Sequence, residues 1–180
     1  MHQTMRANKL HYLINMSIFK PDKIIDRFDL LNIKELKDRG FKAVFIDIDN
    51  TIAIPKTGNL SKQAKEFLDN IKNNGLVPII FSNSTKNRVN RLVDGYDIDA
   101  YYLSLKPLPF IFWIICKKYN LKNFECVIIG DQLLTDIACA NLSGAYGVFC
   151  KKLQEKDTFI TSINRRFEKL IWRHILHEKM

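Results

Sequence analysis

Two aspartates, Asp47 and Asp49, stand two residues apart at the end of an apolar run over residues 43–46. The run is rich in β-branched and aromatic residues and is preceded by Gly40, so it predicts a buried strand that ends in a charged loop. Ligands of open α/β sheets bind just beyond the carboxyl ends of the strands. Two carboxylates this close repel each other, and a hard divalent cation is the usual ion that offsets their charge. The alternative interpretation is a strand followed by an Asx turn, because Asp and Asn also favour turns.

Three further apolar runs, over residues 77–81, 100–103 and 126–129, also predict strands. Their ends carry a hydroxyl and an amide, an ammonium group, and further carboxylates: Ser82 and Asn83, Lys106, and Asp131 with Asp136 beyond it. Because parallel strands end at one edge of a sheet, these groups are expected to meet there. The set suits phosphoryl transfer, in which a metal held by carboxylates and a lysine neutralise the transferring group while a carboxylate acts as nucleophile.

Strands and helical segments alternate along the chain. Helices are expected between Ser61 and Gly75 and over residues 85–94, 110–116 and 133–142, with a fifth strand over residues 146–149. This order predicts right-handed crossovers and a parallel sheet of about five strands with helices on both faces, a three-layer α/β/α fold. Further helices are expected over residues 10–19 and 24–39 and from residue 158 onward. We therefore predict one domain over residues 1–180, with a helical extension (1–40), a catalytic core (41–150) and a basic C-terminal helix (151–180).

The chain of 180 residues has a formal net charge of +9. Residues 1–40 carry 8 basic and 5 acidic side chains and residues 151–180 carry 8 and 4, so most of the excess lies at the ends. A basic surface favours anionic partners: nucleic acid, an anionic membrane or phosphorylated substrates. The four cysteines lack zinc-site spacing and the N-terminus makes a poor signal peptide, so reduced thiols in a cytoplasmic protein are expected. No stretch reaches the roughly 20 apolar residues of a membrane span.

Four motifs in order give the chain a family resemblance. DxDxT corresponds to Asp47–Thr51, a strand-end hydroxyl to Ser82, a lysine to Lys106, and GDxxxxD to Gly130–Asp136. With this set the chain resembles the haloacid dehalogenase superfamily, and within it the capless subclass IIIA, the YqeG-like phosphatases, over about residues 20–170. The resemblance implies a Rossmann-like α/β core. The gaps between the motifs are too short for a sizeable cap domain, so an open site that serves large or surface-bound substrates is expected.

The resemblance also implies a Mg²⁺-dependent phosphatase. Asp47 would attack phosphorus and form an aspartyl-phosphate, and Asp49 would protonate the leaving oxygen and then deprotonate the attacking water. Mg²⁺ would be bound by Asp47, the backbone carbonyl of Asp49, and Asp131. An acid at position 49 favours phosphatase over dehalogenase chemistry.

Other residues are assigned to binding and support. Ser82, Asn83 and Lys106 are expected to hold phosphate oxygens, with Thr51 in support. Asp136 is expected to orient the metal shell or Lys106 rather than bind metal directly. The alternative for Asp136 is a first-turn helix acid that faces the helix dipole.

The family resembled includes phosphatases of phosphatidylglycerophosphate, so the expected reaction yields phosphatidylglycerol. An apolar stripe over residues 10–19, the run 110–116 and the basic tail suit peripheral association with anionic phospholipid at the inner face of a membrane, although each could instead pack on the sheet. One alternative is a phosphatase for a soluble phosphorylated metabolite, nucleotide or protein. Another is a basic RNA- or ribosome-associated module, but the chain carries no nucleic-acid motif, which makes nucleic acid the weakest candidate. No oligomeric state is predicted.

Overall fold

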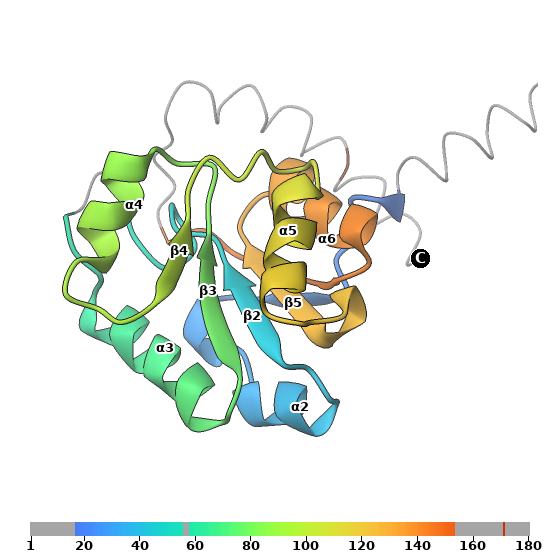
Figure 1. The fold of residues 1–180 in the computed structure, drawn as a ribbon, viewed down its shortest axis with the longest axis horizontal. Coiled ribbons are helices and arrows are strands. Elements are labelled where there is room, and N and C mark those ends of the chain that lie inside the picture. Colours follow the sequence, from blue (N-terminus) through green and yellow to red (C-terminus); the bar gives the residue numbers. More distant parts are fainter. Residues whose placement is uncertain (1–16, 56–57, 154–170, 172–180) are drawn as a thin grey trace, which may run out of the picture.

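The computed structural model describes residues 17–55, 58–153 and 171 and has an α/β fold built on one sheet. The sheet has six strands in the order β1-β6-β5-β2-β3-β4 (Figure 1). Their bounds are Lys23–Ile25 (β1), Ala43–Ile46 (β2), Val77–Phe81 (β3), Asp99–Tyr101 (β4), Cys126–Gly130 (β5) and Tyr146–Cys150 (β6). All neighbouring strands pair in parallel, which confirms the prediction from the alternation of strands and helices.

Helices and helical turns connect the strands. Their bounds are Phe28–Leu30 (η1), Ile33–Asp38 (α2), Lys62–Asn73 (α3), Lys86–Val93 (α4), Phe110–Lys118 (α5), Asn123–Glu125 (η2), Leu133–Ile137 (η3, a π-helical turn) and Ala138–Ser143 (α6). Polar side chains mark two of the starts. Asn32 accepts a hydrogen bond from the Glu35 N–H across 3.0 Å before α2, and the Ser61 hydroxyl accepts one across 3.1 Å before α3.

Alternate strand residues face two separate apolar layers. Val44 and Ile46 of β2 belong to a buried cluster that includes side chains of α2, α3 and α4, whereas Phe45 belongs to a cluster with α5 and α6. All four residues of β2 are buried, which explains why its apolar run is continuous rather than alternating. The fold is therefore the predicted three-layer arrangement.

Residues 24–39 do not form the helical segment expected from their apolar spacing. Lys23–Ile25 forms a sixth strand at the edge of the sheet, paired with β6, and α2 begins only at Ile33. The Lys151 N–H donates to the Ile25 carbonyl across 3.0 Å, which extends this pairing. The prediction of a helix from residue 24 is wrong because pairing with a distant strand overrides the local pattern.

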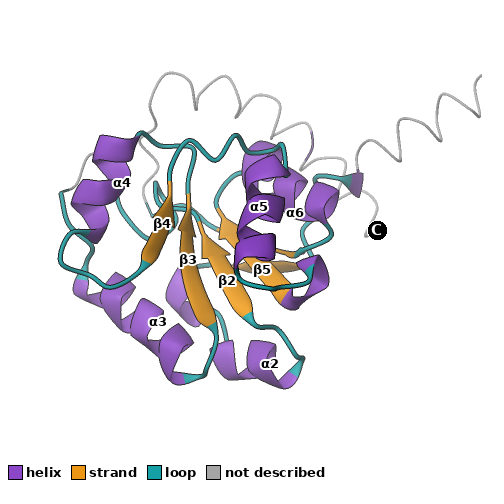
Figure 2. Ribbon diagram, in the orientation of Figure 1, coloured by secondary structure: helices purple, strands orange, loops and turns teal. Residues whose placement is uncertain are grey.

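The strand order reverses at β2. From β2 the chain runs outward through β3 to β4, and it then crosses to β5 and β6 on the other side. The carboxyl ends of β5, β2 and β3 are neighbours at this reversal, which is where open α/β sheets bind ligands. Figure 2 shows the loops that leave these strand ends gathered along one edge of the sheet. The described residues between β2 and α3 form only turns and an isolated bridge from Asp49 to Ala53, so this loop holds no cap domain within the described part.

The terminal helices predicted from the sequence fall largely outside the described residues. Of the stripe at 10–19 only residues 17–19 are described, and of the basic tail beyond residue 153 only Ile171. Ile171 is buried in a small cluster with Leu133, Ile137 and Phe149. At this one position the tail packs on the domain, as the alternative to contact with lipid expected.

Candidate active site

Asp47, the first residue after β2, is buried at the reversal of the strand order. Its N–H donates to the Ile129 carbonyl of β5 across 3.0 Å, so the strand pairing holds its backbone in place. Its carboxylate accepts a hydrogen bond from Lys106 Nζ across 2.7 Å. The nucleophile expected from the sequence thus has a cation beside it that could also neutralise a phosphoryl oxygen.

Burial raises the pKa of Asp47 to about 6, and Lys106 opposes this rise while the charges of Asp136 and Asp49 add to it. Burial alone lowers the pKa of Lys106, but the charges and hydrogen bonds of Asp136 and Asp47 outweigh burial and hold that pKa above its usual value. Lys106 is therefore a permanent cation at neutral pH. Asp47 becomes a full carboxylate more readily when further positive charge enters the site.

The Lys106 side chain is almost fully buried and spans the site. Besides Asp47, Nζ donates to Asp136 Oδ1 across 2.6 Å and to the Phe81 carbonyl at the end of β3 across 2.9 Å. All three ammonium hydrogens therefore have acceptors, which leaves this amine one orientation. Through these hydrogen bonds the lysine connects the carboxyl ends of β2 and β3 with the helical turn η3 after β5.

The Lys106 backbone is held by Asn83. The Asn83 side chain donates to the Lys106 carbonyl and accepts from the Lys106 N–H, each across 2.8 Å. The sequence predicted Asn83 as a phosphate ligand, and in the structure its amide group first of all positions Lys106. Its contact with phosphate stays a prediction.

Asp136 reaches Lys106 from the π-helical turn η3. Its second oxygen accepts from the Gln132 N–H across 3.1 Å, so both carboxylate oxygens have donors. The carboxyl group lies directly over Gly130, where an added Cβ would come within 2.1 Å of Asp136 Cγ. A glycine is therefore required at the end of β5 for Asp136 to reach the lysine. Among the roles expected from the sequence, this geometry supports the one in which Asp136 orients Lys106, which stays a prediction.

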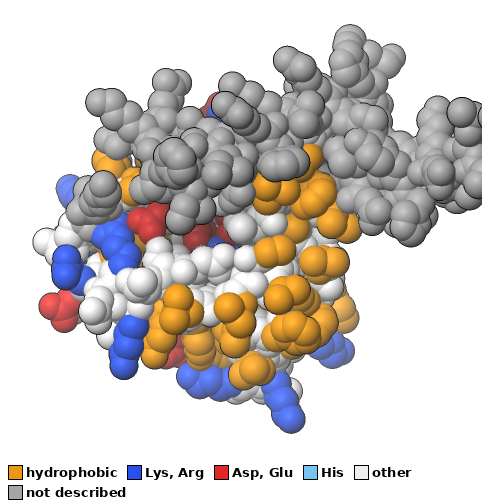
Figure 3. All heavy atoms as spheres, turned by 90° about the horizontal axis from the view of Figure 1, so that it is seen from above, with side chains coloured by type: hydrophobic (Ala, Val, Ile, Leu, Met, Phe, Trp, Pro, Cys, Tyr) orange, Lys and Arg blue, Asp and Glu red, His pale blue; other side chains and the backbone are white. Residues whose placement is uncertain are grey.

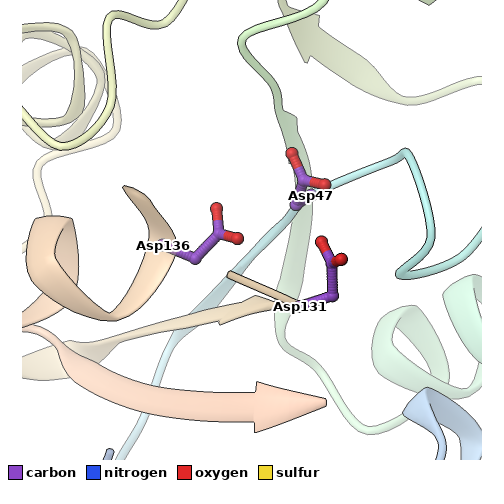
Figure 4. A group of neighbouring side chains, drawn as sticks. All are labelled: Asp47, Asp131 and Asp136. Carbon is purple, nitrogen blue, oxygen red and sulfur yellow. The ribbon is translucent and has the colours of Figure 1, made fainter. Parts of the chain in front are cut away.

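Three buried carboxylates converge at the sheet edge: Asp47, Asp131 and Asp136 (Figure 4). Each contributes an oxygen, and these oxygens lie within 4.8 Å of one another. Lys152 Nζ lies 3.5 Å from Asp131. The two ammonium groups of Lys106 and Lys152 balance two of the three carboxylates, so the cluster keeps one negative charge in excess. Closely spaced carboxylate oxygens with excess negative charge are the donor set that Mg²⁺ prefers. Asp47 and Asp131 fit the metal-ligand roles expected of them, whereas both oxygens of Asp136 already accept hydrogen bonds.

Asp49 points to the start of α4 rather than to Lys106. Its carboxylate accepts from the Ser84 hydroxyl across 2.5 Å and from Arg88 Nη2 across 2.9 Å. Arg88 Nη2 also donates to the Ile54 carbonyl across 3.2 Å, which links α4 to the loop after β2. The expected acid and base is thus held by a hydroxyl and a guanidinium at the rim of the site.

The remaining predicted site residues line the same edge. Ser82 is buried at the end of β3, and its hydroxyl accepts from the Ser84 N–H across 3.2 Å. Thr51 is fully buried, and its hydroxyl has no hydrogen-bond partner among the described residues. Between Asp49 and Thr51, Asn50 has a φ of 66°, a left-handed conformation that Asn tolerates better than most residues. Its carbonyl accepts from the Leu153 N–H across 3.0 Å, which fixes the loop to the segment after β6.

Sequence reasoning missed Ser84, Arg88 and Lys152. Ser84 lies just before Thr85, the N-cap residue of α4, and Arg88 lies in the first turn of that helix. Lys152 lies two residues after the end of β6, at the same sheet edge as the aspartates. The rule that gathers strand ends at one edge could have found Lys152. The contact of Arg88 with Asp49 depends on a loop conformation that the sequence does not indicate.

Comparison with known proteins points to the same chemistry. Residues 19–144 match the model of the haloacid dehalogenase-like hydrolases. The chain is 31% identical over 153 residues to "Probable phosphatase YqeG" of Bacillus subtilis, covering 85% of this chain and 89% of that protein. It is also 31% identical over 157 residues to "Phosphatidylglycerophosphatase GEP4, mitochondrial" of Saccharomyces cerevisiae, covering 80% and 84%.

A solved structure supports the fold alone. A crystal structure of a Listeria monocytogenes serotype 4b protein superposes with a TM-score of 0.53 at 21% identity, covering 66% of this chain and 85% of that one. At this level of identity, the likeness carries no statement about substrate.

Proposed function

The chain belongs to the haloacid dehalogenase-like hydrolases and is a phosphatase, and we propose that it hydrolyses phosphatidylglycerophosphate to phosphatidylglycerol and phosphate. The observation that carries the catalytic part is the contact of buried Lys106 with Asp47 across 2.7 Å, beside Asp131 and Asp136. The substrate is proposed from the relative in yeast, whose name states that activity. The described loop after β2 holds no cap domain, which supports a substrate that is large or remains in a lipid surface.

The proposed reaction has two steps. Asp47 attacks phosphorus while the bond to the glycerol oxygen breaks, and Asp49 gives its proton to that oxygen, which leaves an acyl-phosphate on Asp47. Water then attacks the same phosphorus and gives a proton back to Asp49, which releases phosphate and regenerates Asp47. Lys106 and Ser82 hold phosphoryl oxygens during both displacements.

Asp47 and Asp131 would hold a Mg²⁺ ion, together with the backbone carbonyl of Asp49 as proposed from the family resemblance. When bound, Mg²⁺ supplies positive charge to the phosphoryl oxygens. In this proposal Asp136 keeps Lys106 aimed at the reacting group. Asp49 must leave at least one of its present partners, Ser84 or Arg88, to carry a proton to the substrate.

We further propose that the enzyme works as a peripheral protein at the cytoplasmic face of a membrane. Among the described residues, no helix is both long enough and apolar enough to cross a bilayer. The net charge of +9 supports attraction to anionic lipid.

The test is an assay of the full-length protein on a panel of phosphomonoesters with Mg²⁺. The panel contains phosphatidylglycerophosphate in detergent micelles, glycerol phosphate, nucleoside monophosphates and a phosphopeptide. We expect the highest kcat/KM on the phospholipid, and Asp47→Asn is the control for contaminating phosphatases. A higher kcat/KM on a soluble ester would replace the lipid with that substrate class and leave the family and mechanism intact.

A further inference from the structure

Helix α5 is apolar on two faces, and only one of them is in the core. Phe112, Ile115 and Cys116 are buried against the sheet. Phe110, Trp113 and Ile114 lie on the opposite face, and Ile114 is 63% exposed. The sequence left open whether this run packs on the sheet or faces lipid, and in the structure one of its two faces packs on the sheet.

The exposed face continues into the loop that carries Lys106. Leu103, Leu105 and Leu108 of this loop are 54%, 56% and 49% exposed. With Phe110, Trp113 and Ile114 they form a surface that we call the apolar rim. Figure 3 shows hydrophobic side chains gathered over one part of this face of the molecule. Exposed apolar groups gathered in this way commonly mark an interaction surface.

Two of the rim leucines occupy backbone positions that do not suit leucine. Leu103 has a φ of 46° and Leu105 a φ of 58°, both left-handed. A residue with a Cβ is strained in this region, and Gly or Asn usually occupies it. These leucines therefore lower stability through their backbone and bury little surface inside the protein. Their alternation with Ser104 and Lys106, both buried, turns every second side chain of this segment outward.

Charge on this part of the chain favours an anionic partner. Besides Lys106, which is buried and paired with aspartates, residues 100–122 contain three lysines, all exposed, and no aspartate or glutamate. Lys117 lies seven residues after Phe110 and four after Trp113, so it continues the exposed face of α5, and it is exposed together with Lys118. A helix face with aromatic and aliphatic residues followed by lysines is typical of helices that lie at a membrane surface.

We infer that the apolar rim is the surface by which this protein docks on an anionic lipid bilayer. The inference rests on the proposed function, since a lipid substrate is what places the catalytic edge against a membrane. Leu105 is the direct neighbour of Lys106, whose ammonium lies 2.7 Å from Asp47. Insertion of the rim therefore brings the site to the level of the lipid headgroups, and a substrate phosphate can reach Asp47 while its acyl chains stay in the bilayer.

The test compares vesicle binding by full-length variants without substrate. Trp113→Gln with Ile114→Gln removes the exposed apolar groups of α5 and keeps good helix formers. Phe124→Gln with Leu142→Gln is the matched control, because both side chains are exposed, 68% and 46%, and precede the amino ends of β5 and β6, away from the catalytic edge. Cosedimentation uses phosphatidylcholine vesicles with and without phosphatidylglycerol. We expect the rim variant to bind the anionic vesicles about ten-fold or more weakly, and the control to bind as wild type does.

Activity gives a second readout. The ratio of turnover on phosphatidylglycerophosphate in vesicles to turnover on the same lipid in detergent should fall for the rim variant and stay constant for the control. Leu105→Asn should also weaken vesicle binding without lowering the melting temperature, because Asn adopts a left-handed φ more readily than Leu. This variant separates loss of docking from loss of folding.

Several outcomes overturn the inference. Equal vesicle binding by wild type and the rim variant would do so, as would no binding by wild type. A wild-type dimer that the rim variant splits would assign the surface to a second copy of the chain. If wild type hydrolyses the lipid in detergent but does not bind vesicles, the docking surface is wrong and the proposed function stands. If it binds through the rim but does not hydrolyse the lipid, the proposed substrate is wrong.

Discussion

Asn83 pairs its side-chain amide with both backbone polar groups of Lys106, each across 2.8 Å. The loop after β3 thereby fixes the loop that carries the Lys106 ammonium. The two loops come from segments 23 residues apart. The Ser104 and Leu103 N–H groups also donate to the Ser82 and Ser84 carbonyls, each across 3.0 Å, but only the Asn83 side chain pairs with the Lys106 backbone among the described hydrogen bonds of this loop.

We therefore predict that Asn83→Ala lowers kcat by about ten-fold to a hundred-fold, because a displaced Lys106 no longer matches the transferring group. The measurement is steady-state kinetics on a soluble phosphomonoester together with the melting temperature. Asn90→Ala, an exposed position on α4, is the control and should leave both unchanged. A change confined to KM would instead support direct phosphate binding by Asn83.

Arg88 is predicted to act through Asp49. An aryl phosphate such as p-nitrophenyl phosphate has a good leaving group and needs little protonation, whereas an alkyl phosphate needs a general acid. Asp49→Asn should lower kcat/KM on the alkyl ester far more than on the aryl ester. Arg88→Gln should also lower kcat/KM more on the alkyl ester than on the aryl ester, but by a smaller factor, because it removes the 2.9 Å contact that orients Asp49.

Arg88→Lys is the conservative variant, since it keeps the charge but not the forked geometry of the guanidinium. An equal rise of KM on both esters for Arg88→Gln would mean that the arginine contacts the substrate and does not position Asp49.

Asp47→Asn should reduce turnover to the background of the assay while the protein remains folded. With divalent cations removed, the pKa of Asp47 is raised to about 6 by burial, so the folded protein binds this proton more tightly than the unfolded chain does. The contribution of Asp47 to stability therefore falls as pH rises from about 4 to about 6, and the penalty persists above that range.

Asp47→Asn lacks this titration, so its free energy of unfolding relative to wild type should rise over that pH range by on the order of 3 kcal/mol. The measurement is chemical denaturation in EDTA at several pH values. The pKa of Lys106 is held above its usual value, so this residue stays protonated throughout. Its titration therefore adds nothing to the difference between wild type and Asp47→Asn. A difference that does not change with pH would mean that folding does not raise the pKa of Asp47.

Activity should require Mg²⁺ and disappear in EDTA, and Ca²⁺ should support it poorly because its larger, more flexible shell disturbs the in-line geometry. Asp131→Asn removes one carboxylate of the buried cluster and should raise the Mg²⁺ concentration for half-maximal activity more than it raises KM. A Mg²⁺ titration at saturating substrate measures this directly. Full activity of wild type in metal-free buffer would exclude the assignment.

Gly130→Ala should abolish activity and lower the melting temperature, because the new methyl group would lie within 2.1 Å of Asp136 Cγ. Either Asp136 moves and releases Lys106, or the strand end moves. Gly58→Ala is the control, since an added Cβ there meets nothing within 4 Å and φ is not left-handed. Unchanged activity in Gly130→Ala would show that the contact between Asp136 and Lys106 is dispensable.

The central strands are predictable from the sequence because each is a short apolar run with a polar end. The run at 77–81 matches β3 residue for residue, and the run at 126–129 falls one residue short of β5. β1 is not predictable in this way. It has three residues, of which only Ile25 is buried, and its partner β6 lies more than a hundred residues away in the sequence.

For the site, the rule that parallel strands end at one edge predicts that Asp47, Asp131 and Lys106 meet. The pairings that orient them are not predictable. They depend on loop conformations such as the left-handed φ of Leu105, which its residue type disfavours.

The position of β2 between β3 and β5 has a consequence for how the enzyme forms during synthesis. β3 follows β2 after one crossover, whereas β5 follows some eighty residues later, and Asp131 arrives only with it. Closure of the longer loop carries the larger entropic cost, so β5 docks late. The repelling carboxylates therefore stay apart until most of the chain exists, and catalytic competence appears in a single late step. A protein synthesised only as far as α5 would contain Asp47 and Lys106 but neither Asp131 nor Asp136, and we expect it to be inactive.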